Sequence, residues 1–264
     1  MVCAYSRWLT GLLLPTRTAA VLFAGWWQLI SGLGTVPRVL VWDGEGAIGR
    51  WRAGRVELTA SCQAFRGTLG AKVVVCRPAD PEAKGLVERA HDWLERSFLP
   101  GRSFTSAADF DDQLAGWLAV ANTRTRRALG CSPADRVAAD KAAMLALPPV
   151  APETGWRSWT RLARDHYVRL DSNDYSVHPA VIGRRVEVTA DLDRVRVFCD
   201  GRAVADHERS WAWHQSFTDP GHRSAAAALR RQRVAVLRRP AEPEVQVRAL
   251  ADYDTALGTG GGAA

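Results

Sequence analysis

A proline-rich segment near the middle of the chain separates two regions with different hydrophobic periodicity. Residues 147–155 contain Pro148, Pro149 and Pro152, a proline density typical of a stiff linker. Before this segment, short apolar runs alternate with stretches of helical spacing, and after it apolar and polar residues alternate with a period of two. The sequence therefore predicts two folded regions joined by a linker at residues 145–163.

The first region, residues 1–144, has the pattern of an α/β fold. Strands are predicted at residues 39–42 and 72–76, with one or two more within 2–14. Helices are predicted at residues 18–32 and 56–69, from Pro81 to about 100, from Ser106 to 121, and from Ser132 onward. Because strands alternate with helices, we expect a mostly parallel sheet with helices on its faces.

The second region, residues 164–215, contains five short segments of alternating hydrophobicity separated by turn signals. This pattern predicts a small antiparallel β-barrel or sheet. Residues 216–264 follow as a basic helix, expected at 225–239, and a tail in which residues 258–264 are expected to be disordered.

The charge of the chain favours a polyanionic partner. The 264 residues carry a formal net charge of +7 with a pI near 9.6, which is typical of proteins that bind nucleic acid. Five cysteines occur without any C-x-x-C pair, which argues against zinc sites and disulfide frameworks and predicts reduced thiols in a cytoplasm. The apolar stretch at residues 18–34 is shorter than the ~20 apolar residues a membrane span requires, so no membrane association is expected.

Two carboxylates suggest a metal site. Asp43 directly follows the apolar run 39–42, and Glu88 lies in the helix predicted from Pro81. In an α/β sheet the residue after a strand projects toward the ligand crevice, and carboxylates with substrate phosphate are ligands that Mg²⁺ (or Mn²⁺) accepts. The plainer alternatives stay open: Asp43 as an ordinary strand-to-loop residue, and Glu88 in an exposed pair with Lys84 one turn earlier.

The chemistry that such a pair would support is metal-dependent attack on a phosphodiester bond. Lys84 and Arg89 flank Glu88 and are placed to hold a phosphate backbone, although a solvated helix face explains them equally well. A third carboxylate is expected from an earlier strand, but residues 1–42 contain no Asp or Glu. Glu45 is the nearest substitute ligand. His91, one turn after Glu88, is a further candidate for a catalytic role, although a helix-surface histidine is the commoner explanation.

Four segments together resemble a known family. Residues 39–43, 81–89, 122–135 and 167–179 resemble, in order, the integrase core and C-terminal barrel of bacterial insertion-sequence transposases with a DDE triad. More narrowly, the chain resembles the IstA-type transposase of two-gene insertion sequences. The likeness runs from near residue 1 to about residue 239.

The resemblance implies a fold, an activity and partners. It implies a core of ribonuclease H type, with Asp43 as the second triad aspartate and Glu88 as the triad glutamate. The implied function is DNA integration by metal-dependent transesterification, on double-stranded DNA of transposon ends and target, with self-association and an AAA+ ATPase helper as partner. Arg124, Arg126 and Arg127 of the third segment are then candidate DNA contacts.

The resemblance also implies a missing part. The first triad aspartate and the preceding helix-turn-helix region have no counterpart here, so we expect an N-terminally truncated chain with little strand transfer by itself. Two alternatives remain: a non-catalytic DNA-binding or assembly module derived from a transposase, and a metal-dependent nuclease unrelated to transposition.

Overall fold

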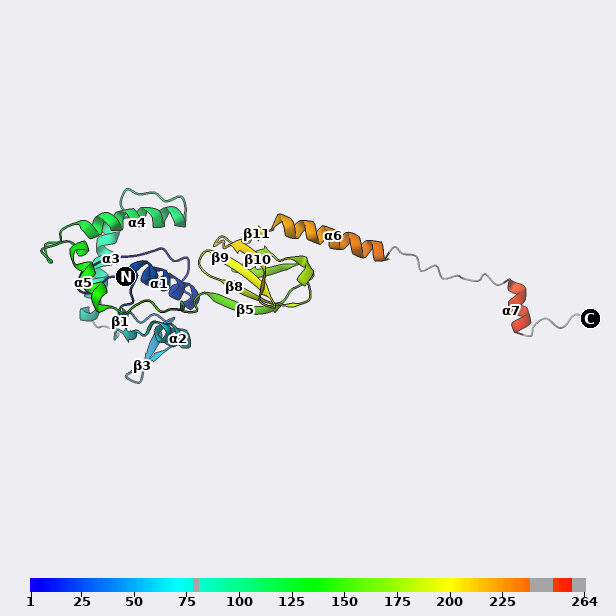
Figure 1. Ribbon diagram of the computed structural model, residues 1–264, viewed down its shortest axis with the longest axis horizontal. Coiled ribbons are helices and arrows are strands. Elements are labelled where there is room, and N and C mark those ends of the chain that lie inside the picture. Colours follow the sequence, from blue (N-terminus) through cyan, green and yellow to red (C-terminus); the bar gives the residue numbers. More distant parts are fainter. Residues whose placement is uncertain (78–80, 238–248, 258–264) are drawn as a thin grey trace, which may run out of the picture.

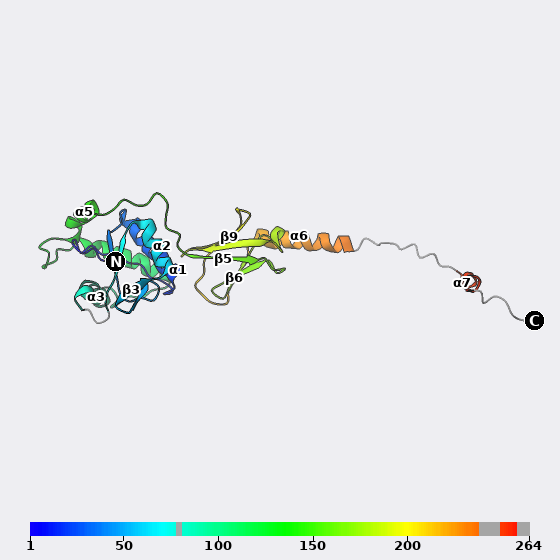
Figure 2. The same ribbon diagram turned by 90° about the horizontal axis from the view of Figure 1, so that it is seen from below.

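The computed structural model describes residues 1–77, 81–237 and 249–257 (Figure 1). In both views the N-terminal region, the C-terminal β region and the last long helix follow one another along the longest axis (Figures 1 and 2). The elements of the N-terminal region are α1 (Ala19–Leu33), β1 (Val39–Trp42), β2 (Gly49–Arg52), β3 (Arg55–Leu58), α2 (Ala60–Leu69), β4 (Lys72–Val75), α3 (Pro81–Ser97), α4 (Ala107–Thr123) and α5 (Pro133–Ala143).

A two-stranded parallel sheet lies at the centre of the N-terminal region. Strands β1 and β4 pair from Val39 opposite Lys72 to Trp42 opposite Val75. Leu40 and Trp42 lie in a buried core with residues of α1 and α2, including Phe23 and Phe65. Val39 and Val41 point to the other side and are 47% and 50% exposed. The expectation of helices on both faces of a larger parallel sheet is therefore wrong for the described residues, because only one face of this pair is covered.

The helix predicted for residues 56–69 is shorter than expected. Val56, Glu57 and Leu58 belong to β3, which pairs with β2 in an antiparallel hairpin. The turn of this hairpin is made by Ala53 and Gly54, both with positive φ. Helix α2 then begins after Thr59, whose side chain accepts a hydrogen bond from the Cys62 N–H. Local turn geometry and this N-cap override the helical spacing of the apolar residues.

The N-terminal residues do not form the predicted strands. Residues 2–14 contain a single isolated bridge, between Val2 and Leu9. Their backbone is held by side chains instead: Leu9 N–H donates to Asn122 Oδ1 at 2.9 Å, and Asn122 Nδ2 donates to the Leu9 carbonyl at 2.9 Å. Ser6 N–H donates to Asp140 Oδ2 at 2.9 Å. Side chains of α4 and α5 thus satisfy the polar backbone groups that a sheet would otherwise pair.

Helices α4 and α5 start where the sequence predicts. The Ser106 side chain caps α4 by accepting from the Asp109 N–H. Ser132 and Asp135 form a capping box at the start of α5, in which each side chain bonds to the backbone of the other residue. These polar residues fix where each helix begins.

The C-terminal region consists of two small antiparallel-rich sheets around one core. Its elements are β5 (Trp156–Arg161), β6 (Tyr167–Leu170), β7 (Asn173–Ser176), the 3-10 helix η1 (Pro179–Val181), β8 (Arg185–Ala190), β9 (Arg194–Cys199), β10 (Arg202–Glu208), β11 (Ser216–Phe217), α6 (Pro220–Leu237) and α7 (Leu250–Ala256). One sheet has the order β10-β9-β8-β5 and the other β11-β7-β6. Inward-facing residues such as Tyr175, Val188 and Val197 form a continuous buried core between them.

The predicted closed barrel is not formed within the described residues. Strand β5 and strand β10 remain the edges of the four-stranded sheet, and no ladder joins them to the other sheet. Strand β5 lies inside residues 145–163, the range predicted as linker, and pairs with β8 along its whole length. The prediction of a small β fold is thus confirmed in the form of two sheets, and the prediction of a closed barrel is wrong for the described residues.

Helix α6 extends away from the β region in both views (Figures 1 and 2). It begins at Pro220, five residues before the predicted start, because Asp219 Oδ1 accepts from the Gly221 and His222 N–H groups and caps the first turn. Residues 238–239 of the predicted helix and the predicted disordered tail at 258–264 lie outside the described residues. None of the helices in the described ranges has the length and apolar content of a transmembrane segment.

Candidate active site

Asp43 lies at the carboxyl end of β1 and is exposed. Its Oδ1 accepts a hydrogen bond from the Gly44 N–H at 2.6 Å, and its carbonyl accepts from the Glu45 N–H at 2.7 Å. These two bonds turn the chain sharply away from the strand. The carboxylate is therefore held at the strand end, which is the position that the sequence predicts.

The chain that leads to Glu88 leaves the same edge of the sheet. Trp42 is paired with Val75, and the Cys76 N–H donates to the Trp42 carbonyl at 2.8 Å. Because β1 and β4 are parallel, Cys76 leaves the sheet at the same edge as Asp43, and α3 begins five residues later at Pro81. The carboxyl edge of a parallel sheet is where ligands bind in α/β folds.

Glu88 occupies the exposed side of α3. The other side of this helix packs against α4 through Ala90, Trp93 and Leu94, and the Trp93 and Trp117 ring centroids are 4.5 Å apart. This packing fixes the rotation of the helix and keeps Glu88 on the solvent side. The convergence of Asp43 and Glu88 on one ion stays a prediction, supported by the shared sheet edge.

A metal site built from these two carboxylates would suit one hard cation better than two. Within the described ranges, no three His, Cys, Asp or Glu side chains are grouped as metal ligands. Glu45 is half-buried, and its carbonyl closes the next turn by accepting from the Ile48 and Gly49 N–H groups. Two carboxylates suit a single Mg²⁺ or Mn²⁺ completed by substrate phosphate and water, whereas a bridged metal pair needs further ligands. His91 is exposed on α3 and belongs to no such ligand group.

Arg89 folds back along α3 toward its start. A Cβ built on Gly85 would lie 3.1 Å from Arg89 Nη1, so the guanidinium covers the glycine. The charge is thereby directed toward the helix N-terminus, where the helix dipole disfavours a cation but favours an anion such as phosphate. The side chain of Lys84 lies outside the described residues. The phosphate-holding role of both residues stays a prediction.

The three arginines of the loop after α4 differ in environment. Arg124 and Arg127 are exposed, whereas Arg126 is half-buried with its Cζ 4.8 Å from the centre of the Trp93 ring. Burial, followed by the nearby charge of Arg7, lowers the pKa of Arg126, and its Nη2 has no hydrogen-bond partner among the described residues. Arg126 thus attaches this loop to α3, while Arg124 and Arg127 remain accessible to a polyanion.

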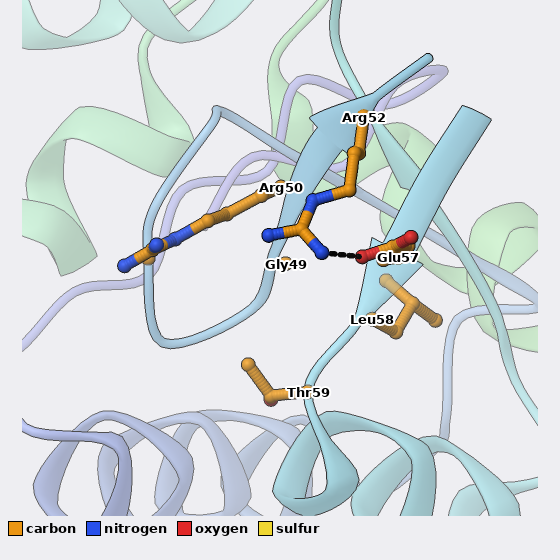
Figure 3. Close-up of a pocket in the computed structure, with 7 residues that line it drawn as sticks. Gly49, Arg50, Arg52, Glu57, Leu58 and Thr59 are labelled. Atoms are coloured by element: carbon orange, nitrogen blue, oxygen red, sulfur yellow. Dashed lines mark ion pairs between the residues drawn. The ribbon is translucent and has the colours of Figure 1, made fainter. Parts of the chain in front are cut away.

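A pocket beside the β2–β3 hairpin was not indicated by the sequence. Arg52 Nη1 lies 3.7 Å from Glu57 Oε2, whereas the Arg50 side chain extends away from this pair (Figure 3). The pocket is lined by Gly46, Gly49, Arg50, Arg52, Glu57, Leu58 and Thr59. A Cβ on Gly49 would lie 2.6 Å from the Glu57 carbonyl oxygen, so only glycine fits here. Residues 56–58 were predicted as part of a helix, so the hairpin that forms this pocket was not expected.

Comparison with known proteins connects both regions to one class. Residues 147–219 match the model of the Mu transposase C-terminal domain. Over 192 residues, the chain is 29% identical to the transposase for insertion sequence element IS21 of Pseudomonas aeruginosa, an alignment covering 72% of this chain and 49% of that protein. The chain is related to insertion-sequence transposases.

Two further relatives agree. A protein of Mycobacterium tuberculosis named as a transposase is 34% identical over 137 residues, which is 50% of this chain and 33% of the relative. A protein named as the transposase for insertion sequence element IS5376 of Geobacillus stearothermophilus is 24% identical over 233 residues, which is 87% of this chain and 56% of the relative. The chain thus spans about half or less of the length of most of these relatives.

Proposed function

We propose that this chain is a part of an IstA-type insertion-sequence transposase that binds double-stranded DNA and takes part in DNA integration. The single observation that supports a catalytic role is the common sheet edge: Asp43 ends β1, and the chain leaving the adjacent parallel strand β4 leads into α3 and Glu88. The relation to insertion-sequence transposases supports the reaction class.

Asp43 and Glu88 would hold Mg²⁺ or Mn²⁺ on this core of proposed ribonuclease H type. When bound, the cation would activate a hydroxyl nucleophile and stabilise the leaving oxygen at phosphorus. Arg89 would contact the DNA backbone near the start of α3, and Lys84 on the same helix would add a second cation. Arg124 and Arg127 would extend this basic surface, with Arg126 fixing the loop on Trp93.

The proposed partners are transposon-end and target DNA, further copies of the chain, and an AAA+ ATPase helper. The net charge of +7 supports the nucleic-acid partner, because Lys and Arg neutralise phosphates and release counterions. The exposed valines of β1 support self-association, since an uncovered apolar sheet face favours contact with another surface.

Metal binding by the purified 264-residue chain tests the catalytic assignment. Calorimetric titration with Mn²⁺ in the presence of a short duplex should show binding that Asp43→Asn and Glu88→Gln each weaken at least tenfold. Matched controls are Glu57→Gln, whose carboxylate lies 3.7 Å from Arg52 on the β2–β3 hairpin, and Asp92→Asn, which pairs with Arg96 at 3.1 Å on the same helix as Glu88. Equal metal binding by all four variants would remove both residues from the site.

A non-catalytic DNA-binding or assembly module is the second candidate. It is favoured by one observation, which is that no group of three metal ligands occurs within the described residues. Under this alternative the wild-type chain binds DNA but takes up no Mn²⁺, and strand transfer of labelled ends is not detected. Cleavage of DNA without joining of ends would instead indicate a metal-dependent nuclease.

A further inference from the structure

Most arginines on the outer face of the four-stranded sheet are neutralised by carboxylates. The ion pairs are Arg157–Glu187 at 3.1 Å, Arg194–Asp206 at 2.9 Å and Arg196–Asp191 at 3.0 Å. Each pair joins neighbouring strands or a strand and its own turn. This part of the sheet therefore presents little net charge to a partner.

Two arginines at the other end of the same strands differ. Arg161 of β5 and Arg185 of β8 lie directly opposite each other in the ladder, and both are exposed. Within the described residues, neither forms an ion pair with a carboxylate; Arg161 Nε donates to the Gly183 carbonyl at 2.6 Å. Like charges directly opposite each other destabilise a sheet, so this pair lowers stability where the rest of the face does not.

A tryptophan completes this surface. Trp159 is 40% exposed, and the Arg185 Cζ lies 5.6 Å from the centre of its ring. Stacking on an aromatic face orients a guanidinium while leaving its N–H groups available for an anion. Strand β5 is an edge of the sheet, so no further strand covers this side within the described residues.

A helix that packs against the nearby 3-10 helix η1 also carries positive charge. Gly183, which accepts the bond from Arg161, follows η1, and α6 packs against η1. Helix α6 carries Arg223, Arg230, Arg231 and Arg233, and residues 220–237 include no Asp or Glu. The like-charged pair is thus connected, through Gly183 and η1, to a helix whose positive charge attracts anions over a longer range.

We propose that Arg161, Arg185 and Trp159 form a binding surface for the phosphate backbone of DNA at the edge of the four-stranded sheet. The inference rests on the proposed function in one respect, which is that DNA is the partner. Guanidinium groups match phosphate oxygens with paired hydrogen bonds, and binding of a phosphate would relieve the repulsion between the two arginines. Contacts of this kind position DNA without reading its sequence.

DNA binding without divalent metal tests the proposal. Fluorescence anisotropy of the full 264-residue chain with a random-sequence duplex, in EDTA and over a salt series, gives the affinity and its salt dependence. Loss of two phosphate contacts in Arg161→Gln/Arg185→Gln should reduce the slope of log K against log salt by about 2 and weaken binding roughly tenfold or more at moderate salt. The matched control Arg157→Gln/Arg196→Gln removes the same charge from ion-paired positions and should bind like the wild type, within about twofold.

A charge-preserving variant separates binding from folding. Arg161→Lys/Arg185→Lys should keep the wild-type salt slope, because each lysine still neutralises a phosphate. An unchanged salt slope in Arg161→Gln/Arg185→Gln would overturn the proposal. An equal loss of slope in this variant and in the control Arg157→Gln/Arg196→Gln would overturn it as well. If Arg161→Gln/Arg185→Gln loses binding to a polyglutamate peptide but keeps its DNA binding, the proposal is also overturned, in favour of an acidic protein partner.

The result is independent of the catalytic assignment. Asp43→Asn and Glu88→Gln should bind DNA in EDTA with the wild-type slope. If these variants show no defect in metal binding while Arg161→Gln/Arg185→Gln shows the reduced salt slope, the catalytic proposal fails and the proposed DNA-binding surface is supported.

Discussion

The four-stranded antiparallel sheet of the C-terminal region and the parallel pair β1–β4 of the N-terminal region bury their strands differently. In the C-terminal region, strands β8 and β9 turn one side inward, where Val186, Val188, Val195 and Val197 are each at most 2% exposed, and the second sheet covers them. In the N-terminal region, the parallel pair β1–β4 is covered on one side only, and Val41 on the other side is 50% exposed. The two C-terminal sheets therefore complete a core between them. The parallel pair leaves one face uncovered, although parallel strands are ordinarily covered on both faces.

The first residues of the chain satisfy their backbone polar groups differently from the C-terminal strands. Strands of the C-terminal region pair with one another in regular ladders. The N-terminal residues rely on single side chains, chiefly Asn122, which both donates to and accepts from Leu9. A ladder distributes its stability over many bonds, whereas a clamp of this kind depends on one residue.

The largest effect is expected at Tyr175 in the C-terminal core. Tyr175 is 0% exposed, its ring stacks on Phe217 with 5.2 Å between centroids, and its hydroxyl accepts from the Ser210 N–H at 3.0 Å. Tyr175→Ala should lower the free energy of unfolding of this region by about 3–5 kcal/mol, because it leaves a cavity in a close-packed core. Hydrogen-exchange mass spectrometry should show lost protection in β6 to β10.

Two further measurements test whether the N-terminal and C-terminal regions fold independently of each other. Tyr175→Phe retains the ring and should cost only about 1–2 kcal/mol, because it loses the two hydrogen bonds that the hydroxyl makes with the Ser210 backbone. Protection of α4 and α5 should be unchanged in Tyr175→Ala if the two regions fold separately. Equal loss of protection in both regions would contradict the predicted division of the chain.

A smaller effect, confined to the N-terminal region, is expected at Asn122. Asn122 is 2% exposed, and its replacement by alanine leaves the buried N–H and C=O of Leu9 without partners. The free energy of unfolding should fall by roughly 2–3 kcal/mol, measured by urea denaturation. The neighbouring Thr123→Ala, at an exposed position, serves as control, and a comparable loss in that variant would argue against the clamp.

A weaker and pH-dependent effect is expected at the start of α5. Ser132→Ala should reduce stability by about 1 kcal/mol at neutral pH through loss of the N-cap. Hydrogen bonds from the Ser132 hydroxyl and then its backbone N–H lower the pKa of Asp135 below its ordinary value of 3.8. Because the folded state favours the ionised carboxyl, this contribution is present above pH 3.8 and is lost as the pH falls through the lowered folded-state pKa.

The acid limb of urea midpoints between pH 6 and pH 3 checks this assignment. The wild type should lose stability more steeply than Ser132→Ala as the carboxyl is protonated. Ser132→Thr keeps a capping hydroxyl and should retain most of the wild-type slope. Parallel acid limbs in all three proteins would show that the capping box does not couple to the titration of Asp135.

The smallest effect is expected on the exposed side of β1. Val41→Thr should change the free energy of unfolding by no more than about 0.5 kcal/mol, since the side chain is half exposed and threonine is also β-branched. Sedimentation at several concentrations measures self-association in the same samples. A weakened association in Val41→Thr, with the exposed Val120→Thr on α4 as control, would assign the uncovered face of β1 to an interface between copies.

Much of the local structure could be predicted from the residues alone. The alternation at residues 185–198 predicted β8 and β9, and Ser106 and Ser132 marked the starts of α4 and α5, because caps and period-two patterns depend only on neighbouring residues. Asp43 at the end of β1 was predicted on the same basis. The helix expected at residues 56–58 was wrong, because the Ala53–Gly54 turn and the pairing with β2 outweigh helical spacing.

The amino-acid sequence by itself determined where most of the helices and several of the strands lie, the basic charge of the chain, and which carboxylates and arginines are candidates for function. Only the tertiary structure decided that the C-terminal sheet stays open, that Arg126 packs on Trp93, and that Arg161 faces Arg185 without a carboxylate between them. The physical reason is range. Propensity, capping and hydrophobic period act between residues close in sequence, whereas ladder register, ion pairing and burial depend on which distant segments meet.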